Sequence, residues 1–464
     1  MRLFELLTIL TLVPFVIAPL FKKRPFWINF LPFLAGIFAL LSLAFEQYRW
    51  QMFPAYLLLV VCILIAILNI RKRQNYGRSW LTILTSCIGM IWLLIVLFIP
   101  IALPVPTFID TTGPYGIGTE SYYLVDESRE EIYTQETNDP RELMAQVWYP
   151  IDKGTGETPA PYLEALNVAG PIIAQRFNLP SFLLEHINLT DTGIYKDVAI
   201  ASGEMRFPVI LFSHGLTGIR GQNTGMIREL VSHGYVVAAV DHTYANALTV
   251  FPDGRVILYD PTRIFASGET NPVEGEQLVQ VWADDLAFLL DQLTLWNEEN
   301  GHVVNGRLDL NNVGVFGHST GGGTTIRFCT DDARCQAAAP LDSWVLPVGE
   351  DVLSTPPSQP FMFISTPEWL GPFNQERGRA ILEALPNDGY ELTLANTGHY
   401  DFTDIPLLSP LTPQLNLSGT IDSRLSSSIQ NEYLLAFFNQ YLKGSDEKIF
   451  AQPSPHPELT IRRN

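Results

Sequence analysis

The stretch that most constrains the fold of this chain is Gly317-His-Ser-Thr-Gly321, within the longer run from Val313 to Gly323. Residues 313–316 are apolar and rich in β-branched side chains, which predicts a buried strand. Residues 321–328 are expected to begin a helix. A serine at a sharp strand-to-helix turn needs small neighbours, because its backbone is held in a strained conformation. The pattern therefore predicts that Ser319 stands at the apex of such a turn as a nucleophile.

This Gly-x-Ser-x-Gly turn is the nucleophile elbow of α/β-hydrolases. The alternative is a glycine-rich turn with an incidental serine, since five-residue patterns occur by chance. The rest of the body favours the elbow, because strands alternate with helices as in a mainly parallel sheet with flanking helices. The expected strands are 121–124, 143–149, 207–212, 235–240, 313–316, 336–341, 360–364 and 390–395, and the expected helices are 223–233, 274–299 and 429–442. Residues 160–187 show interrupted helical spacing, which indicates either a cap or a surface that leans on lipid, or else helices packed on the sheet.

The distribution of charge divides the chain into unlike parts. The first 103 residues contain nine Lys and Arg against two Glu, whereas the remainder contains 20 basic and 46 acidic residues. We therefore expect a membrane region over 1–103, an acidic catalytic domain over 104–443 and a loose tail over 444–464. An acidic body repels nucleic acid, which makes that class of partner improbable.

Four apolar stretches in the first part approach the ~20 residues that a bilayer helix needs. They are 6–21, 26–45, 52–70 and 79–103, and they predict an all-α transmembrane bundle. The first is the shortest and has a second interpretation as a cleaved signal sequence. The basic cluster at 22–24 lies on its far side, which argues against cleavage. No charged residue lies within the second, third or fourth stretch, so a transport path has no support.

The basic residues between these stretches predict the orientation of the bundle, because such residues stay in the cytoplasm. The connections after the first and third stretches contain seven: Lys22, Lys23, Arg24, Arg71, Lys72, Arg73 and Arg78. The opposite side has only Arg2 and Arg49. We expect a multi-pass protein of a bacterial plasma membrane whose acidic body lies outside the cytoplasm.

A serine hydroxyl needs a positioned imidazole as base and a carboxylate that orients the imidazole. In this fold the chain order is Ser, acid, His. Only His399 and His456 follow Ser319, and His456 lies between prolines in the tail, which leaves His399 as the base. For the acid, Asp342 and Glu368 each follow an expected strand, and the residues themselves leave the choice open.

The oxyanion of the reaction needs two backbone donors. We expect the amide of Thr320, directly after the nucleophile, and the amide of Leu216, in the loop after residues 207–212. His214, His242 and Trp344 are candidates for the substrate pocket, although His242 has an equal alternative as part of a structural pair. No His, Cys, Asp or Glu cluster has ligand spacing, so neither a metal nor a cofactor is expected.

Several motifs together resemble the plasma-type platelet-activating factor acetylhydrolases, or lipoprotein-associated phospholipases A2. They begin at Gly113, Phe212, Ser232, Gly317 and Leu341, and read Gly-Pro-Tyr-Gly-Ile-Gly, Phe-Ser-His-Gly-Leu, Ser-His-Gly-Tyr-Val-Val-Ala-Ala-Val-Asp-His, Gly-His-Ser-Thr-Gly-Gly and Leu-Asp-Ser-Trp-Val-Leu-Pro. The resemblance covers about residues 110–443. It implies that Asp342 is the acid, and it supports Ser319, His399 and the Leu216 amide.

That family hydrolyses the sn-2 ester of phospholipids with short or oxidised acyl chains, without calcium, so the resemblance implies this activity here. Two features depart from the family. Thr320 stands where phenylalanine is common, and the secreted enzymes have no four-span front, so lipoprotein association is not carried over. The alternative to this activity is that of a general carboxylesterase or a cutinase-like polyester hydrolase. A non-catalytic membrane protein is the alternative from another class, and the complete set of candidate catalytic residues argues against it.

Two further expectations concern partners and cysteines. The expected partners are an ester substrate and the lipid bilayer, and no feature indicates an obligate protein partner. Cys329 and Cys335 lie six residues apart, and an extracytoplasmic location would let them pair. If both lay on one helix, their side chains would face different directions, so a disulfide and two free thiols stay open.

Overall fold

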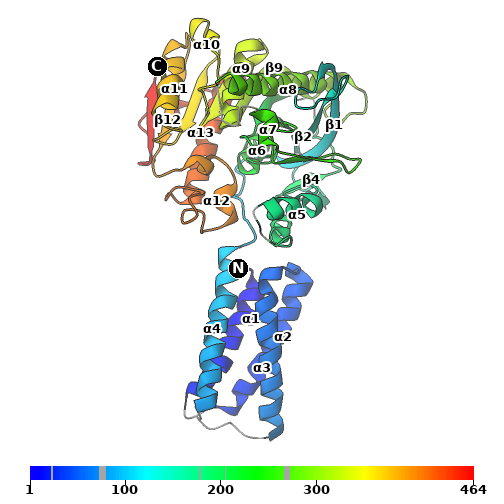
Figure 1. Ribbon diagram of the computed structural model, residues 1–464, viewed down its shortest axis with the longest axis vertical. Helices are drawn as coiled ribbons and strands as arrows, with labels where there is room; N and C mark the ends of the chain where they lie inside the picture. The colour runs from blue at the N-terminus through cyan, green and yellow to red at the C-terminus, as the bar shows by residue number, and fades with distance from the viewer. Residues whose placement is uncertain (22–23, 73–79, 177, 179, 204, 266–271) are drawn as a thin grey trace. The chain divides into compact units, whose positions relative to one another are not determined.

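The computed structural model describes residues 1–21, 24–72, 80–176, 178, 180–203, 205–265 and 272–464. Two compact units divide the chain (Figure 1). The first unit holds residues 1–106, 170–190 and 408–411, and the second holds 107–169, 191–407 and 412–464. The expected boundary near residue 103 therefore lies close to the observed one, but two short segments of the expected catalytic domain belong to the first unit.

The first unit is built on four long apolar helices: α1 Leu3–Ile17, α2 Leu31–Leu41, α3 Phe53–Lys72 and α4 Trp80–Ala102. With their short extensions, all four are long and apolar enough to cross a membrane. Large apolar side chains point outward along them, among them Leu40 and Leu94, each 67% exposed. Water is a poor solvent for so many exposed aliphatic groups, whereas lipid suits them. Of the basic residues used for the orientation, Lys22, Lys23, Arg73 and Arg78 lie outside the described residues.

One buried ion pair lies at the start of α1. Arg49 Nη2 is 2.6 Å from Glu5 Oε2, and both side chains are fully buried. Arg49 also donates to the carbonyl of Leu103 at 3.3 Å. The pair thus joins the first helix to the segment before α3 and to the end of α4. Glu5 also pairs with Arg2 at 2.6 Å, so loss of Glu5 is the costly change, because it leaves the buried Arg49 without its carboxylate.

Residues 170–190 contact the helical bundle. They include the end of α5 Leu166–Arg176. The indole nitrogen of Trp50 donates to the carbonyl of Leu183 at 3.2 Å, and the rings of Trp50 and Phe182 meet edge to face with centroids 5.2 Å apart. Residues 170–187, which belong to the region of interrupted helical spacing, are therefore not simply packed on the sheet.

The second unit is organised by an 11-stranded sheet in the order β13-β12-β11-β10-β9-β5-β6-β2-β1-β4-β3 (Figure 1). The strands from β12 to β6 in this order are parallel. β13 is antiparallel to β12, β2 is antiparallel to both β6 and β1, and β1 is parallel to β4. The strand bounds are β1 Gly116–Glu130, β2 Pro140–Ile151, β3 Thr158–Pro159, β4 Ile194–Lys196, β5 Phe207–Ser213, β6 Val236–Asp241, β9 Leu308–His318, β10 Cys335–Leu341, β11 Phe361–Ser365, β12 Gly389–Leu394 and β13 Leu459–Arg463. A hairpin of β7 Leu248–Val250 and β8 Val256–Leu258 stands apart.

Helices cover both faces of this sheet. The bounds are α6 Thr224–Ser232, α7 Pro261–Ile264, α8 Pro272–Glu298, α9 Thr320–Asp331, α10 Asp351–Ser354, α11 Pro372–Ala384, α12 Ile405–Leu408 and α13 Ser423–Lys443. The side chains of β5 alternate: Val209 and Leu211 pack in one core with α8, α9 and α11, whereas Ile210 and Phe212 pack in the other with α6 and α13. This is the two-sided burial of a central parallel strand. The unit has the predicted α/β-hydrolase architecture.

The expectation of a loose tail is wrong. Residues 459–463 form β13, which pairs antiparallel with β12 from Tyr390 to Leu394. Leu459 and Ile461 alternate with polar residues and face the core that contains α13. The alternation is the signal that reveals an edge strand.

Cys329 and Cys335 form a disulfide. The two cysteines do not lie on one helix. Instead, α9 ends at Asp331 and Cys335 is the first residue of β10, so the chain reverses between them and brings the sulfurs together. The disulfide links the helix after the elbow to the strand that leads to Asp342.

Replacing both cysteines with serine is expected to lower the free energy of unfolding by roughly 2 kcal/mol, because a short cross-linked loop is released in the unfolded chain. Thermal unfolding of the full chain in detergent measures the change. Cys87→Ala, which removes a thiol outside this disulfide, is the control. Equal midpoints for the double variant and the control would contradict the expectation.

Candidate active site

The candidate residues gather at one edge of the sheet because parallel strands end there together. The loops after β5, β6, β9, β10 and β12 contribute Leu216, His242, Ser319, Asp342 and His399 in turn. Residues up to 183 positions apart are thus brought to one edge by strand direction. This is where open α/β sheets bind their ligands.

Ser319 lies between β9 and α9 in a strained backbone conformation, with φ 57° and ψ −117°. The glycines on either side are required by close approaches. A Cβ on Gly317 would lie 2.2 Å from the carbonyl oxygen of Gly321, and a Cβ on Gly321 would lie 2.1 Å from that of Ser213. The predicted strand-turn-helix is therefore present, and the backbone packs too tightly for larger residues beside the serine.

The structure pairs His399 with Asp342. His399 Nδ1 lies 2.6 Å from Asp342 Oδ2, and the other carboxylate oxygen accepts from the backbone and hydroxyl of Thr366 at 2.9 and 3.0 Å. Asp342 is 1% exposed, whereas the His399 side chain is 25% exposed. Glu368, the other candidate acid, is exposed in the loop after β11. A carboxylate that accepts from Nδ1 leaves Nε2 of a neutral imidazole free to take a proton.

His318 brings the loop of His399 next to the elbow. Its ring lies 4.5 Å from that of His399, and its Nε2 lies 3.0 Å from the carbonyl oxygen of His399. Because a carbonyl only accepts, Nε2 is the donor, so Nδ1 accepts from the side chain of Gln222 at 3.0 Å. Burial holds the pKa of His318 well below its usual value, with the nearby His399 as a further cause. Sequence reasoning missed both His318 and Gln222.

The amide of Thr320 directly follows Ser319, and the amide of Leu216 belongs to the loop after β5. A Cβ on Gly215 would lie 3.3 Å from the Cβ of Ser319, which places the loop after β5 against the nucleophile. Among the hydrogen bonds of the described residues, neither amide has an acceptor within the protein. Two donors without partners beside a candidate nucleophile match the requirements of an oxyanion site.

The three pocket candidates differ in exposure. His214 and His242 are completely buried, so neither lines an open pocket, and His242 pairs with Asp285. Burial lowers the pKa of His214 to about 3, and the adjacent His242 contributes. Trp344 is partly buried and packs with Leu216 and Tyr244 on an apolar cluster. The cluster comprises Tyr133, Ala245, Ile264, Phe265, Leu278 and Trp282.

A metal site is not evident. Over the ranges that the structure describes, no group of three or more His, Cys, Asp or Glu side chains is placed to hold an ion.

Comparisons with known proteins agree with this fold. The family model described as platelet-activating factor acetylhydrolase, isoform II, matches residues 107–253 and 293–457. A platelet-activating factor acetylhydrolase from Bos taurus is 30% identical over 272 residues, which are 52% of this chain and 59% of the relative. A bis(hydroxyethyl) terephthalate hydrolase from Streptomyces coelicolor is 28% identical over 35% of this chain and 41% of its own.

A solved structure extends the comparison. A ferulic acid esterase from Streptomyces cinnamoneus superposes with a TM-score of 0.60 and 26% identity, over 77% of this chain and 99% of the esterase. The fold is that of the α/β-hydrolases. Because the family model matches more than half of the residues, the chain belongs to the platelet-activating factor acetylhydrolase, isoform II, family. The chain spans about three fifths of the length of its bovine relative.

Proposed function

We propose that this protein is a serine esterase that cleaves the sn-2 ester of phospholipids with short or oxidised acyl chains. The observation that carries the proposal is the 2.6 Å contact between His399 Nδ1 and Asp342 Oδ2, with His399 held against His318, the residue before the strained Ser319. Membership of the family and the bovine relative's name support the substrate class.

The chemistry that we propose begins at His399. Its Nε2 takes the proton of Ser319 as Oγ attacks the ester carbonyl carbon, and the carbonyl oxygen becomes an oxyanion held by the Leu216 and Thr320 amides. The imidazolium then protonates the departing glycerol oxygen, which leaves an acyl-enzyme and a lysophospholipid. Water, deprotonated by His399, releases the acid and regenerates the serine. No step needs calcium.

The apolar cluster beside Leu216 and Trp344 is the proposed acyl site. Both side chains are partly buried against it, and Leu216 carries one of the oxyanion amides. Apolar walls suit a short acyl chain and give little binding energy to a charged one. Thr320, smaller than the phenylalanine common in the family, leaves more room beside the nucleophile.

We further propose that helices α1 to α4 anchor the enzyme in a membrane, with the acidic body on the extracytoplasmic side. The length and apolar surface of the helices support the anchor, and the distribution of Lys and Arg supports the side. An ester substrate that resides in the same bilayer would then be concentrated near the enzyme.

A general carboxylesterase is the second candidate, supported by the terephthalate hydrolase and ferulic acid esterase relatives. The test compares kcat/KM of the full chain in detergent for phosphatidylcholines with sn-2 acyl groups of increasing length and for an aryl acetate, with and without a calcium chelator. We expect the short-acyl lipids to have the highest kcat/KM, unaffected by chelation. A higher value for the aryl ester would favour the second candidate.

A further inference from the structure

A second, fully buried Ser-His-Asp arrangement lies behind the candidate site. His242 Nδ1 lies 2.9 Å from Asp285 Oδ2, and His242 Nε2 lies 3.0 Å from the hydroxyl of Ser213. All three residues are 0% exposed, so no substrate reaches them. Ser213 ends β5 and directly precedes the loop that contains Leu216.

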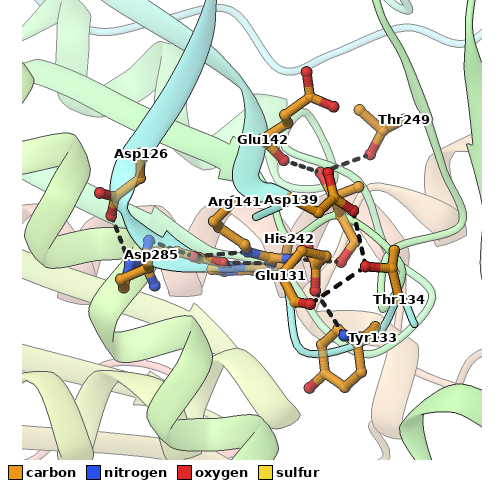
Figure 2. A network of polar contacts seen from close by, with 12 residues as sticks. Asp126, Glu131, Tyr133, Thr134, Asp139, Arg141, Glu142, His242, Thr249 and Asp285 are labelled. Atoms are coloured by element: carbon orange, nitrogen blue, oxygen red, sulfur yellow. Dashed lines mark hydrogen bonds and ion pairs between the residues drawn. The ribbon is translucent and has the colours of Figure 1, made fainter. Parts of the chain in front are cut away.

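Two arginines determine the protonation states of Asp285 and His242. The carboxylate of Asp285 accepts two hydrogen bonds from Arg141 at 3.1 and 2.7 Å and one from Arg129 at 2.9 Å. Arg141 in turn pairs with Glu131, as Figure 2 shows. An anion between two guanidinium groups remains ionised, so His242 donates from Nδ1 and accepts from the Ser213 hydroxyl at Nε2. The His242 ring is also stacked on Trp282, with centroids 4.1 Å apart.

The backbone of His242 sets the tautomer of His214. The amide of His242 donates to His214 Nε2 at 3.1 Å. Nε2 therefore has no proton, and His214 Nδ1 is the atom that donates to the carbonyl of Gly215, at 2.7 Å. The amide of Gly218 donates to the same carbonyl at 2.8 Å.

These contacts determine the direction of one peptide group. The carbonyl of Gly215 and the amide of Leu216 belong to the same planar unit, and in a trans peptide they point in opposite directions. The described chain has no cis peptide bond. Holding the Gly215 carbonyl against His214 and Gly218 therefore turns the Leu216 N–H away from them, where it has no protein acceptor among the described residues.

We infer that His214, held by the Asp285–His242–Ser213 arrangement, is a positioning residue that aims the Leu216 amide at the oxyanion of the reaction. This inference rests on the proposed esterase function. It assigns a role to two histidines that do not touch the substrate. Preorganised donors stabilise charge better than donors that must turn during the reaction.

Two substitutions of His214 separate positioning from stability. In His214→Asn the side-chain amide nitrogen can occupy the place of Nδ1 and donate to Gly215, but the acceptor for His242 is lost. In His214→Gln the side-chain oxygen can occupy the place of Nε2 and accept from His242, but the donor to Gly215 is lost. Each variant keeps one of two buried hydrogen bonds, so their thermal midpoints should fall by similar amounts.

We expect His214→Gln to lower kcat about a hundredfold, as for removal of an oxyanion donor, with little change in KM. His214→Asn should keep kcat within about tenfold of the wild type, a smaller loss than removal of the donor. The affinity of a trifluoromethyl ketone, whose serine adduct carries an oxyanion, should fall in parallel with kcat/KM.

Equal losses of kcat in both variants, or unchanged ketone affinity in the Gln variant, would overturn the inference. If the Gln variant does not accumulate, a hundredfold loss in a folded Asn variant overturns it as well. Absence of ester turnover by the wild type would instead refute the proposed function.

Discussion

Alanine at position 319 is expected to lower kcat for ester hydrolysis by about six orders of magnitude. The variant has no hydroxyl to form the acyl-enzyme, and loss of a nucleophile that acts with its base removes nearly all of the covalent pathway. Labelling by a fluorophosphonate, which reacts with an activated serine, should disappear at the same time. Initial rates with a short-acyl phosphatidylcholine and the intensity of labelling measure the two effects.

Ser354→Ala is the matched control. Ser354 lies at the exposed end of α10, and its hydroxyl donates to backbone carbonyls of the preceding turn. This variant should keep full activity and labelling. Labelling that persists in Ser319→Ala would show that another residue is the nucleophile, and would contradict the proposed mechanism.

Much of the fold was predictable because its signals are local. Each central strand combines an apolar run with a turn at its end, and all eight expected strands appear in the sheet, with bounds shifted by a few residues. The largest shift is at β1, which extends from Gly116 to Glu130 rather than over 121–124. Its polar residues after Val125 hide the strand, and the pairing with β2 is irregular there, with a register shift between Asp126 and Glu130.

The acid could not be chosen from residue types and strand order alone. Asp342 follows β10 and Glu368 follows β11, and these neighbouring strands end at the same edge of the sheet. The two candidates differ in the backbone path of the loop that contains each of them. Asp342 has a positive φ of 35° and anchors one oxygen on Thr366, which turns the other toward His399. Such a path depends on backbone detail that no pattern of hydrophobicity encodes.

The buried polar network was also beyond sequence reasoning. Arg141 and Asp285 are 144 residues apart, and each occurs in a segment that shows no motif. A buried charge pair is recognisable only when both partners are placed in space. The same holds in the helical unit, where Glu5 pairs with Arg49, 44 residues away, as well as with its sequence neighbour Arg2.

Substitution of Asp342 by asparagine is expected to lower kcat about ten-thousandfold. The asparagine amide would present N–H toward His399 Nδ1 and so favour the tautomer with the proton on Nε2. That imidazole cannot accept the proton of Ser319. Initial rates with the same short-acyl lipid measure the loss, and KM should change little because the carboxylate does not touch the proposed acyl site.

Glu368→Gln is the control that distinguishes the two candidate acids. The Glu368 side chain is exposed, so removal of its charge should leave kcat within about twofold, since an exposed charge at a distance is screened by water and salt. A ten-thousandfold loss in this variant, with activity retained in Asp342→Asn, would assign the acid to Glu368. Because Asp342 is buried and shares its carboxylate between Thr366 and His399, its replacement changes the orientation of the base itself, whereas the charge of Glu368 can act on His399 only through solvent.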